Sequence, residues 1–398
     1  MDYQLLSHLF YSNPESYDTM YALRLNGEST YKFNFAVDEH PCFMVITPEI
    51  LTLVNNILSM DNIVTDLSYD LPVLAFNKYT KKCLIDEVLL TNEIEGVVST
   101  RQEINTILET LESGKKKDRL YGLVRKYNML ANRDKIPLEA SHDIRDLYND
   151  LCYDEVQKES ADNALDGTLF RKGSVDVLSP TQKVIHQGLY PESEIIKWMD
   201  VALTDLNNQS IIPLVRISAF HFFFGYIHPF YDGNGRTSRF ISSYLLSKQL
   251  NILLPFRLSL TIKKNLNRYY KAFVETNKKR NLGDLTYFVA SFLSIILQAE
   301  KDLYDDIQDN LNTFHFFEDK IKKSNYASKT KKILNCLIIN TLFGEQDLSR
   351  ADIAEEADIS LYSVNKGLKE LEASQILVIK KNGNTNLFSV DLDHFSEQ

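Results

Sequence analysis

The pattern of apolar and polar positions along the chain predicts a mainly helical protein. Residues 213–227, PLVRISAFHFFFGYI, are apolar nearly all round and begin with a proline suited to a first helical turn, which predicts a buried central helix. Residues 237–250, TSRFISSYLLSKQL, predict a second apolar helix, and Pro255 limits its continuation. Further helices are expected from residue 285 to about residue 322.

The first hundred residues combine a short strand signal with a long helix. The alternation in YKFNF, residues 31–35, is typical of a strand. In residues 80–96, TKKCLIDEVLLTNEIEG, apolar side chains recur at helical spacing, and Gly96 follows as a C-cap. Thr100, with Glu103 three residues later, predicts a capping box that opens another helix.

Two β-prone segments interrupt the helical pattern. Residues 169–178, LFRKGSVDVL, contain two short β-prone runs around Lys172-Gly173 and predict a hairpin. Residues 376–391, ILVIKKNGNTNLFSVD, predict a second hairpin around NGN. This second hairpin follows a predicted helix-turn-helix, an order that resembles a winged helix, so residues 327–398 are predicted to form a separate winged-helix domain.

Composition and charge narrow the function classes. The chain has 398 residues, 25% of them charged, and a length that suggests two or three domains. A net charge of −10 argues against a general binder of polyanions. The four cysteines are scattered without CxxC spacing, which favours buried thiols in a reducing cytoplasm. The N-terminal residues lack a basic region before a long apolar segment, and no membrane span is predicted.

One stretch carries residues that core packing does not require: HPFYDGNGRTSRF, residues 228–240. Between two apolar helices it becomes a connecting loop followed by a helix N-terminus, where free N–H groups and the helix dipole favour an anion. Arg236 and Arg239 lie three apart on one helix face, so with that N-terminus they form a cradle for a polyphosphate.

The same stretch supplies a metal ligand and a base. Asp232 offers one hard oxygen beside the cradle, which suits Mg²⁺ held together with phosphate oxygens and water. His228 can accept a proton at neutral pH. The set predicts transfer of a nucleotide fragment to a hydroxyl. His221, seven residues earlier inside the apolar run, is interpreted as a core histidine.

The residues HPFYDGNGRTSR resemble the Fic signature, HxFx(D/E)GN(G/K)RxxR, at every fixed position. The resemblance implies a mainly α fold: a Fic-type helical core with a short β-hairpin flap, plus the C-terminal winged helix (α+β). The implied domains are an N-terminal region, 1–100, that ends in an inhibitory helix, a catalytic core, 101–322, and the winged helix, 327–398. The hairpin near Phe170–Val177 resembles the flap that holds the target segment by strand addition.

The implied activity is Mg²⁺-dependent transfer of AMP from ATP to a Ser, Thr or Tyr hydroxyl of a protein, with release of pyrophosphate. Carried over residue by residue, the family's roles would fall as follows: His228 as base, Phe230 as packing anchor, Asp232 as Mg²⁺ ligand, Gly233, Asn234 and Gly235 as anion hole, Arg236 at the β-phosphate and Arg239 at the γ-phosphate.

An inhibitory element is also implied. TNEIEG, residues 91–96, resembles the Fic-associated inhibitory motif, (S/T)xxxE(G/N), with Thr91, Glu95 and Gly96 at its fixed positions. The resemblance implies that Glu95 pairs with Arg239 and occupies the γ-phosphate site. In some relatives this glutamate also positions water to remove AMP, so both directions of the reaction stay open.

The expected partners are ATP, a protein target and a second copy of the chain, and the expected location is the cytoplasm. From Ala327 onward the chain carries 8 Lys or Arg and 11 Asp or Glu, whereas DNA readers usually concentrate positive charge. Protein contact or dimerisation is therefore favoured for this domain. The alternative is a DNA-binding regulator in which the Fic core senses a nucleotide.

Overall fold

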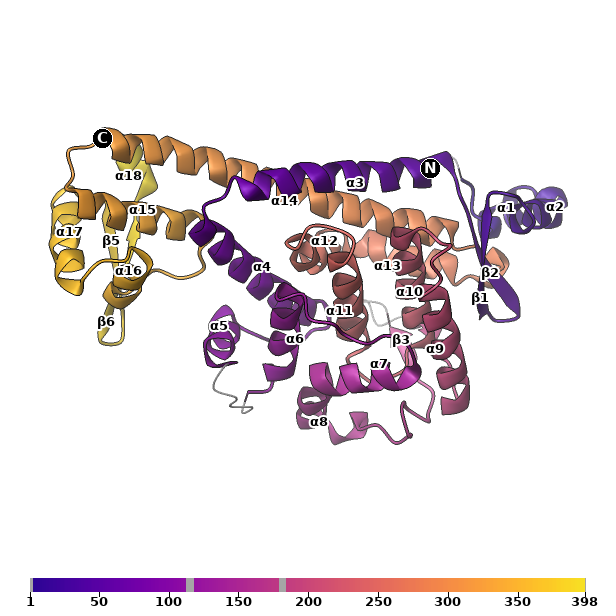
Figure 1. Ribbon diagram of the computed structural model, residues 1–398. Coiled ribbons are helices and arrows are strands. Elements are labelled where there is room, and N and C mark those ends of the chain that lie inside the picture. The colour runs from indigo at the N-terminus through magenta and orange to yellow at the C-terminus, as the bar shows by residue number, and fades with distance from the viewer. Residues whose placement is uncertain (1–2, 112–117, 179–183, 398) are drawn as a thin grey trace. The chain divides into compact units, whose positions relative to one another are not determined.

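The computed structural model describes residues 3–111, 118–178 and 184–397 (Figure 1). The described part is mainly helical, and its strands form three two-stranded sheets, β1-β2, β3-β4 and β5-β6. The chain divides into two compact units, residues 1–62 with 85–301, and residues 63–84 with 302–398. The unit boundaries fall within the helices α3, Pro48–Tyr69, α4, Val73–Ile94, and α14, Thr286–Lys323. The predicted domain boundaries at residues 100 and 322 stay predictions.

The first unit begins with two short helices and a hairpin. Helices α1, Leu6–Ser12, and α2, Pro14–Leu25, precede the antiparallel strands β1, Thr30–Val37, and β2, His40–Val45. The strand predicted at residues 31–35 is therefore confirmed. The Asp205 carboxylate accepts hydrogen bonds from the backbone N–H groups of Asn34 and Phe35, at 3.1 and 3.0 Å, so it joins β1 to a later helix, α9, Glu192–Leu206.

Two apolar helices form the centre of the first unit. Helix α10, Pro213–Ile227, begins with proline and buries nearly every side chain, as predicted. Helix α11, Asn234–Ser247, follows after the loop of residues 228–233, and α9, Glu192–Leu206, also packs on α10. His221 is the predicted core histidine: it is buried, with its two ring nitrogens 2.8 and 2.7 Å from hydroxyl oxygens of Ser242 and Tyr269.

The remaining elements of the first unit surround this pair. They are α5 (Arg101–Thr110), α6 (Tyr121–Ala131), α7 (Ser141–Tyr148), the π-helical turn Asn149–Tyr153, α8 (Asp154–Glu159), the 3₁₀ turns Ala161–Asn163, Leu254–Arg257 and Lys279–Asn281, α12 (Leu258–Lys264) and α13 (Leu266–Thr276). The N-cap of α5 forms as predicted, because the Thr100 hydroxyl accepts a hydrogen bond from the Glu103 N–H at 3.2 Å.

The hairpin predicted around Lys172-Gly173 is wrong in position. The described strands are β3, Asp176–Leu178, and β4, Val184–Gln187, paired antiparallel. The residues just before β3 are used for packing, because Phe170 and Arg171 are fully buried. Their side chains are fixed by the helical core rather than by a partner strand, so the predicted first run remains outside the sheet.

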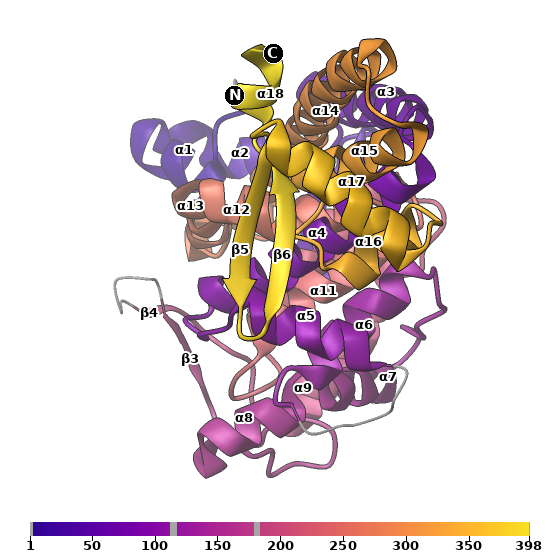
Figure 2. The same ribbon diagram turned by 90° about the vertical axis from the view of Figure 1, so that its left-hand side faces the viewer.

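The second unit contains the C-terminal elements. Helices α15, Ser328–Phe343, α16, Arg350–Glu356, and α17, Leu361–Ala373, are followed by the hairpin of β5, Leu377–Asn382, and β6, Thr385–Val390, which Figure 2 shows side by side. Helix α18, Leu392–Glu397, ends the described chain. The hairpin turns at the predicted NGN, where Gly383 has a φ of 57°. The winged-helix assignment itself stays a prediction.

The described helices were also tested for membrane crossing. Among them, none combines the length and the apolar character that a membrane span requires.

Candidate functional site

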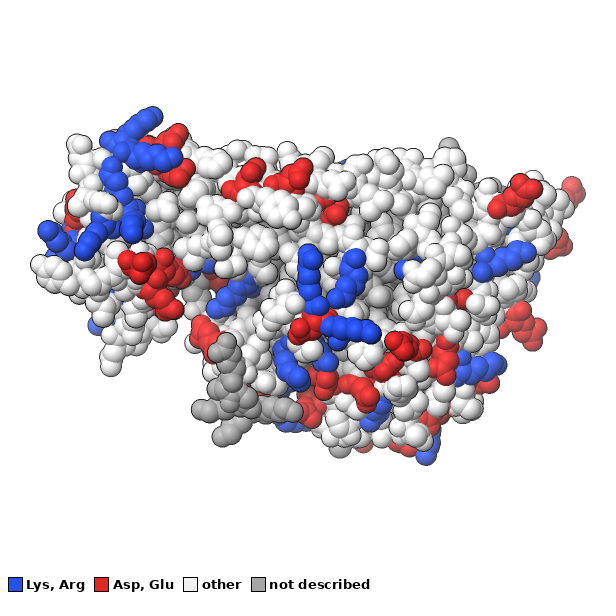
Figure 3. Space-filling model, in the orientation of Figure 1, with Lys and Arg blue, Asp and Glu red and all other residues white. Residues whose placement is uncertain are grey.

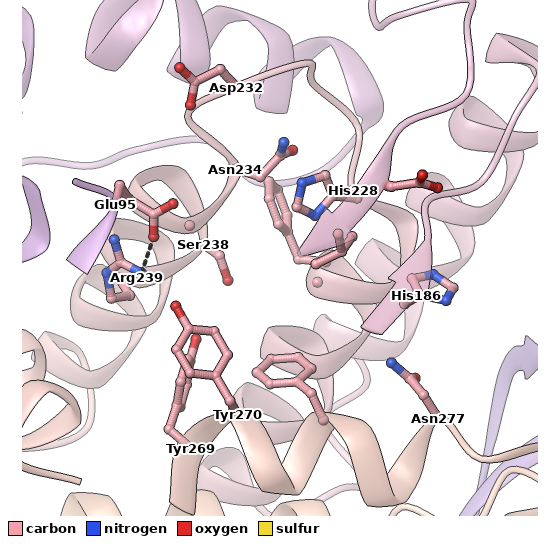
Figure 4. Close-up of a pocket in the computed structure, with 16 residues that line it drawn as sticks. Glu95, His186, His228, Asp232, Asn234, Ser238, Arg239, Tyr269, Tyr270 and Asn277 are labelled. Atoms are coloured by element: carbon pink, nitrogen blue, oxygen red, sulfur yellow. Dashed lines mark ion pairs between the residues drawn. The ribbon is translucent and has the colours of Figure 1, made fainter. Parts of the chain in front are cut away.

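A pocket of about 380 Å³ lies where the loop after α10 meets α11 and α13 (Figure 4). Residues of the β3-β4 hairpin and of the segment just after α4 complete its lining. Five of the predicted site residues line it: His228, Asp232, Asn234, Gly235 and Arg239, together with the predicted inhibitory residue Glu95. Residues far apart in the sequence thus converge on one cavity of the size of a small-molecule site.

His228 ends α10 in an unusual backbone conformation. Its φ of 50° and ψ of 64° place it in the left-handed region, which costs a non-glycine residue about 1 to 2 kcal/mol. The side chain lines the pocket. Burial, followed by the positive charge of Arg171, lowers the pKa of His228 to about 4, against the opposing charge of Glu95. The imidazole is therefore neutral at neutral pH, as a proton acceptor must be.

The loop after His228 is held by its own side chains. The Phe230 ring stacks on the Tyr148 ring with centroids 3.7 Å apart and is fully buried, as a packing anchor is expected to be. The Asn234 side chain accepts from the Phe230 N–H at 2.9 Å and donates to the Phe230 carbonyl at 2.8 Å. Gly233 has a φ of 78°, which glycine tolerates without strain. The loop is thus fixed before any ligand arrives.

Asp232 lies at the rim of the pocket, with its side chain 32% exposed. One of its oxygens accepts a hydrogen bond from the Gly233 N–H and lies 3.8 Å from Arg236 Nη2. Within the described ranges no group of three His, Cys, Asp or Glu residues gathers as in a metal cage built by protein alone. A single rim carboxylate suits Mg²⁺, which commonly binds through one or two carboxylates and substrate phosphates.

Arg236 lies behind the pocket rather than in its lining. The residue is fully buried and forms an ion pair with Glu155 of α8, which is 1% exposed. Arg119 Nη1 lies 3.5 Å from the other oxygen of Glu155. Arg236 Nε and Nη2 have no hydrogen-bond partner among the described residues. Two donors of this buried guanidinium are thus without a hydrogen bond, although Arg236 is not part of the pocket lining.

Arg239 forms the ion pair that the inhibitory motif predicts. Its Nη1 lies 2.8 Å from Glu95 Oε1, and the dashed line in Figure 4 marks this contact. Its Nε donates to the Thr91 hydroxyl and its Nη2 to the Thr91 carbonyl, both at 2.9 Å. Burial disfavours the charge of Arg239, but the Glu95 carboxylate raises the pKa above its ordinary value. Thr91 and Glu95 therefore hold one guanidinium between them.

The backbone beside this ion pair is also specific. Helix α4 ends at Ile94, and Gly96 follows with a φ of 77°, as a C-cap glycine does. A Cβ atom at Gly235 would lie 2.1 Å from Glu95 Oε1 and 2.9 Å from Arg239 Nη1. A Cβ at this first turn of α11 would therefore displace the end of the Glu95 side chain from its present contact with Arg239.

Comparison with known proteins agrees with this geometry. Residues 117–246 match the family model of the Fic/DOC family. The chain carries a Fic domain. The match includes the whole loop of residues 228–233 and all of α11 except its last residue, while Glu95 and α13 lie outside it.

Solved structures of Fic proteins also resemble the chain. A Fic family protein from Desulfovibrio desulfuricans matches with a TM-score of 0.52 and 20% identity, over 87% of this chain and 97% of that one, which shows a shared fold. A Fic domain containing signaling protein from Bacteroides thetaiotaomicron matches with a TM-score of 0.44 and 16% identity, over 66% and 97%. Fic-1 from C. elegans gives 0.42 and 20%, over 65% and 74%. A search of curated proteins found no match.

The Fic pocket also contains residues that the sequence did not single out. Tyr269 and Tyr270 of α13 lie opposite the loop, and Asn277 follows the end of this helix (Figure 4). Phe273 of α13 also lines the pocket, so the helix contributes an aromatic wall. The Asn277 side-chain oxygen is buried without a hydrogen-bond partner among the described residues. Aromatic faces with one buried polar atom suit a planar heterocycle. In the sequence these residues read only as one face of an amphipathic helix.

Proposed function

We propose that the chain is a Mg²⁺-dependent protein adenylyltransferase, which transfers AMP from ATP to a Ser, Thr or Tyr hydroxyl of a protein and is restrained by Glu95. The observation that carries this proposal is the meeting of His228, Asp232 and Arg239 in one pocket, with Glu95 on the arginine. A base, a hard carboxylate oxygen and a guanidinium are the groups that transfer from a polyphosphate requires.

The residues of the pocket fit ATP. The unpartnered donors of Arg236 and the guanidinium of Arg239 lie on neighbouring turns of α11, where they can pair with phosphate oxygens. The aromatic wall of α13 offers a surface for the base of the nucleotide. Mg²⁺ held by Asp232 would neutralise charge on the phosphates as the bond to the leaving group breaks.

In the proposed step, the target hydroxyl oxygen forms a bond to the α-phosphorus, and the bond from that phosphorus to the bridging oxygen of the β-phosphate breaks. His228 takes the hydroxyl proton, because its imidazole is neutral and faces the pocket. Arg236 and Arg239 stabilise the charge on the departing pyrophosphate. Asn234 and Phe230 keep the loop rigid while charge moves.

Glu95 restrains this activity by occupying the guanidinium that the γ-phosphate needs. Its carboxylate is 25% exposed, so the pair reaches solvent and can be exchanged for a phosphate. Two anions cannot share one guanidinium without repulsion, which weakens ATP binding. In the second direction of this proposed chemistry, the same carboxylate positions water for removal of AMP from the modified protein.

The test is labelling of protein by ATP carrying ³²P at the α-phosphate. Glu95→Gly protein with Mg²⁺ should label itself or lysate proteins about tenfold more than the wild type, the equivalent of about 1.4 kcal/mol of released binding energy. His228→Ala in the Glu95→Gly background should lose about 100-fold or more, because the base is gone.

Two controls separate the alternatives. ATP labelled at the γ-phosphate should give no stable label, since the pyrophosphate leaves. Glu93→Gly is the matched control for Glu95→Gly, because Glu93 lies at the same helix end but pairs with Lys263 at 3.2 Å, away from Arg239. Equal labelling by wild type and Glu95→Gly would contradict the restraint, and no label in any variant would contradict the activity.

For residues 327–398 we propose a winged helix that contacts protein rather than DNA. Lys380, on β5, lies 2.9 Å from the Asp347 carboxylate, so one of the few basic groups of this hairpin is already neutralised. In Figure 3 several Lys and Arg side chains gather at the left end of the view, where these C-terminal elements lie, and Asp and Glu side chains lie beside and below them. A salt-dependent gel shift of generic duplex DNA at physiological ionic strength would overturn this proposal and support the DNA-binding alternative.

A further inference from the structure

One buried arginine of the Fic domain has no role in the chemistry described so far. Arg171, just before β3, is 0% exposed, and among the described residues no carboxylate forms an ion pair with it. Burial lowers the pKa of Arg171 to about 10, which still leaves the guanidinium charged at neutral pH. The Asp166 carboxylate favours the charge of Arg171 but forms no ion pair with it among the described residues, so hydrogen bonds have to compensate the cost of burying this guanidinium.

Those hydrogen bonds converge on the backbone of His228. Arg171 Nε and Nη2 donate to the His228 carbonyl at 2.9 and 2.7 Å, and Nη2 also reaches the Ile227 carbonyl at 3.4 Å. A further N–H of the guanidinium donates to the Gly173 carbonyl. The Arg171 backbone N–H donates to the Pro229 carbonyl at 3.3 Å. The side chain thus caps the C-terminal end of α10, where a helix favours positive charge.

The neighbouring residue Gly188 makes this arrangement possible. A Cβ atom at Gly188 would lie 2.4 Å from Arg171 Nη2 and 3.0 Å from His228 Cβ. The guanidinium, the left-handed His228 backbone and the Gly188 backbone therefore pack as one unit. A planar group with several donors in a fixed fork can fix a carbonyl direction, whereas a lysine ammonium cannot do so in the same way.

We propose that Arg171 is a positioning residue for the base: it holds the His228 backbone in the left-handed conformation that directs the imidazole into the pocket. The catalytic consequence rests on the proposed function, because His228 acts as base only in that reaction. The backbone consequence does not rest on it and can be measured without ATP.

The charge of Arg171 has a second effect at the same place. The charged or titratable groups that act on the His228 imidazole are Arg171, Glu95 after α4, and His186 of β4, and Asp176 and Asp232 line the same pocket. Arg171 and His186 favour the neutral imidazole, whereas Glu95 favours the protonated one. Removal of Arg171 is therefore expected to raise the pKa of His228.

The first test uses ATP-free protein and so does not depend on activity. In histidine-labelled Arg171→Ala protein, the His228 ring signals, identified by their loss in His228→Ala, should move and titrate at higher pH than in the wild type. Arg145→Ala is the matched control, because Arg145 Nη1 donates to the Leu169 carbonyl at 3.2 Å in the same segment, and among the described residues Arg145 forms no hydrogen bond with His228. Unchanged His228 signals in Arg171→Ala would overturn the proposal.

The second test separates positioning from general loss of structure. In the Glu95→Gly background, Arg171→Ala should lower kcat for AMP transfer about 100-fold, as for a misplaced reacting group, with ATP affinity nearly unchanged. Added guanidinium ion should restore part of kcat in Arg171→Ala and none in His228→Ala. If Arg171→Ala does not fold, Arg171→Lys takes its place as the test variant, because it keeps charge and bulk. Arg171→Lys should also lower kcat. A parallel loss of ATP affinity and kcat, without rescue, would contradict positioning.

The results of the two tests distinguish failure of the adenylyltransferase proposal from failure of the positioning proposal. If no variant transfers AMP while the His228 signals respond to Arg171→Ala, the adenylyltransferase proposal fails and the positioning of His228 stands. If Glu95→Gly protein transfers AMP and Arg171→Ala leaves both kcat and the His228 signals unchanged, the positioning proposal fails alone.

Discussion

Arg236 and Arg239 lie one turn apart on α11, and each is paired with a carboxylate, but the two pairs differ in their access to solvent. Arg236 and Glu155 are 0% and 1% exposed, whereas Glu95 is 25% exposed on an Arg239 that is 1% exposed. A buried pair cannot be opened without leaving a charge stranded in the protein. A pair with one partner at the surface can exchange that partner for another anion. The same chemical contact is therefore closed to solvent in one place and open to exchange in the other, which the proposed restraint by Glu95 requires.

The largest expected effect breaks the buried pair. Glu155→Ala should destabilise the protein by about 3 to 5 kcal/mol, because it leaves the Arg236 guanidinium uncompensated in the core. Glu95→Gln should cost less than Glu155→Ala, because the glutamine amide oxygen can still accept a hydrogen bond from Arg239 and water reaches this partly exposed side chain. Urea unfolding of the two variants and the wild type measures both. Similar losses in the two variants would show that the pairs do not differ in this way.

A smaller effect tests the fit of the exposed pair against α11. Gly235→Ala should be destabilising in the wild type, because its Cβ would lie 2.1 Å from Glu95 Oε1. Glu95→Gly removes that oxygen, so the double variant should recover about 1 kcal/mol or more of the loss as a coupling energy. Denaturant unfolding of the four proteins in the cycle gives this value. As a control, Gly235→Ala combined with Glu155→Gln should show no such recovery. If the stability losses of Gly235→Ala and Glu95→Gly are additive in the double variant, the predicted contact between these positions is contradicted.

The smallest expected effect is electrostatic: the two ion pairs should differ in their influence on the pKa of His228. Burial and Arg171 lower the pKa of His228 to about 4, and the Glu95 charge opposes this shift. Glu155 is not among the groups that shift the pKa of His228. Glu95→Gln should therefore lower the titration midpoint of the His228 ring, and Glu155→Gln should leave it unchanged. Titration of the ring signals in ATP-free protein measures this. An upward movement in Glu95→Gln would contradict the assigned sign.

If the chain has the proposed transferase activity, the same lowered pKa of His228 sets the acid limb of its pH profile. The plot of kcat/KM against pH should stay level through the ordinary histidine value of about 6.5 and fall only toward pH 4. Stability follows the same direction: the unfolded chain binds a proton at higher pH than folded His228 does, so stability is lost as pH falls from about 6.5 toward 4.

The sequence predicted those parts of the site that lie in continuous motifs. His228, Asp232, Asn234, Gly235 and Arg239 reach the pocket because one loop and one helix turn carry them. The partnership of Glu95 with Arg239 followed from a second short motif, and the structure contains that ion pair. His221 was identified as a core residue because it lies inside an apolar run that forms a buried helix.

Other parts depend on contacts between distant segments and left no signal in the sequence. Glu155 is 81 residues from Arg236, in a polar stretch where nothing distinguishes it from its neighbours. Tyr269 and Tyr270 satisfy the pattern of any amphipathic helix, and only packing places them on the pocket. The hairpin before α9 was placed too early, because the burial of Phe170 and Arg171 takes precedence over their local strand preference.

The partial exposure of Glu95 has a consequence for how the protein responds over time. Under the proposed function, a pair that reaches solvent exchanges between closed and open forms, so the Arg239 guanidinium is available to ATP in a fraction of the molecules. The apparent affinity for ATP is then the intrinsic affinity multiplied by that open fraction. If removal of Glu95 raises affinity about tenfold, the pair is open about one tenth of the time. A partner that binds the open form would raise this fraction in a graded manner, so the output of the protein would follow partner concentration smoothly.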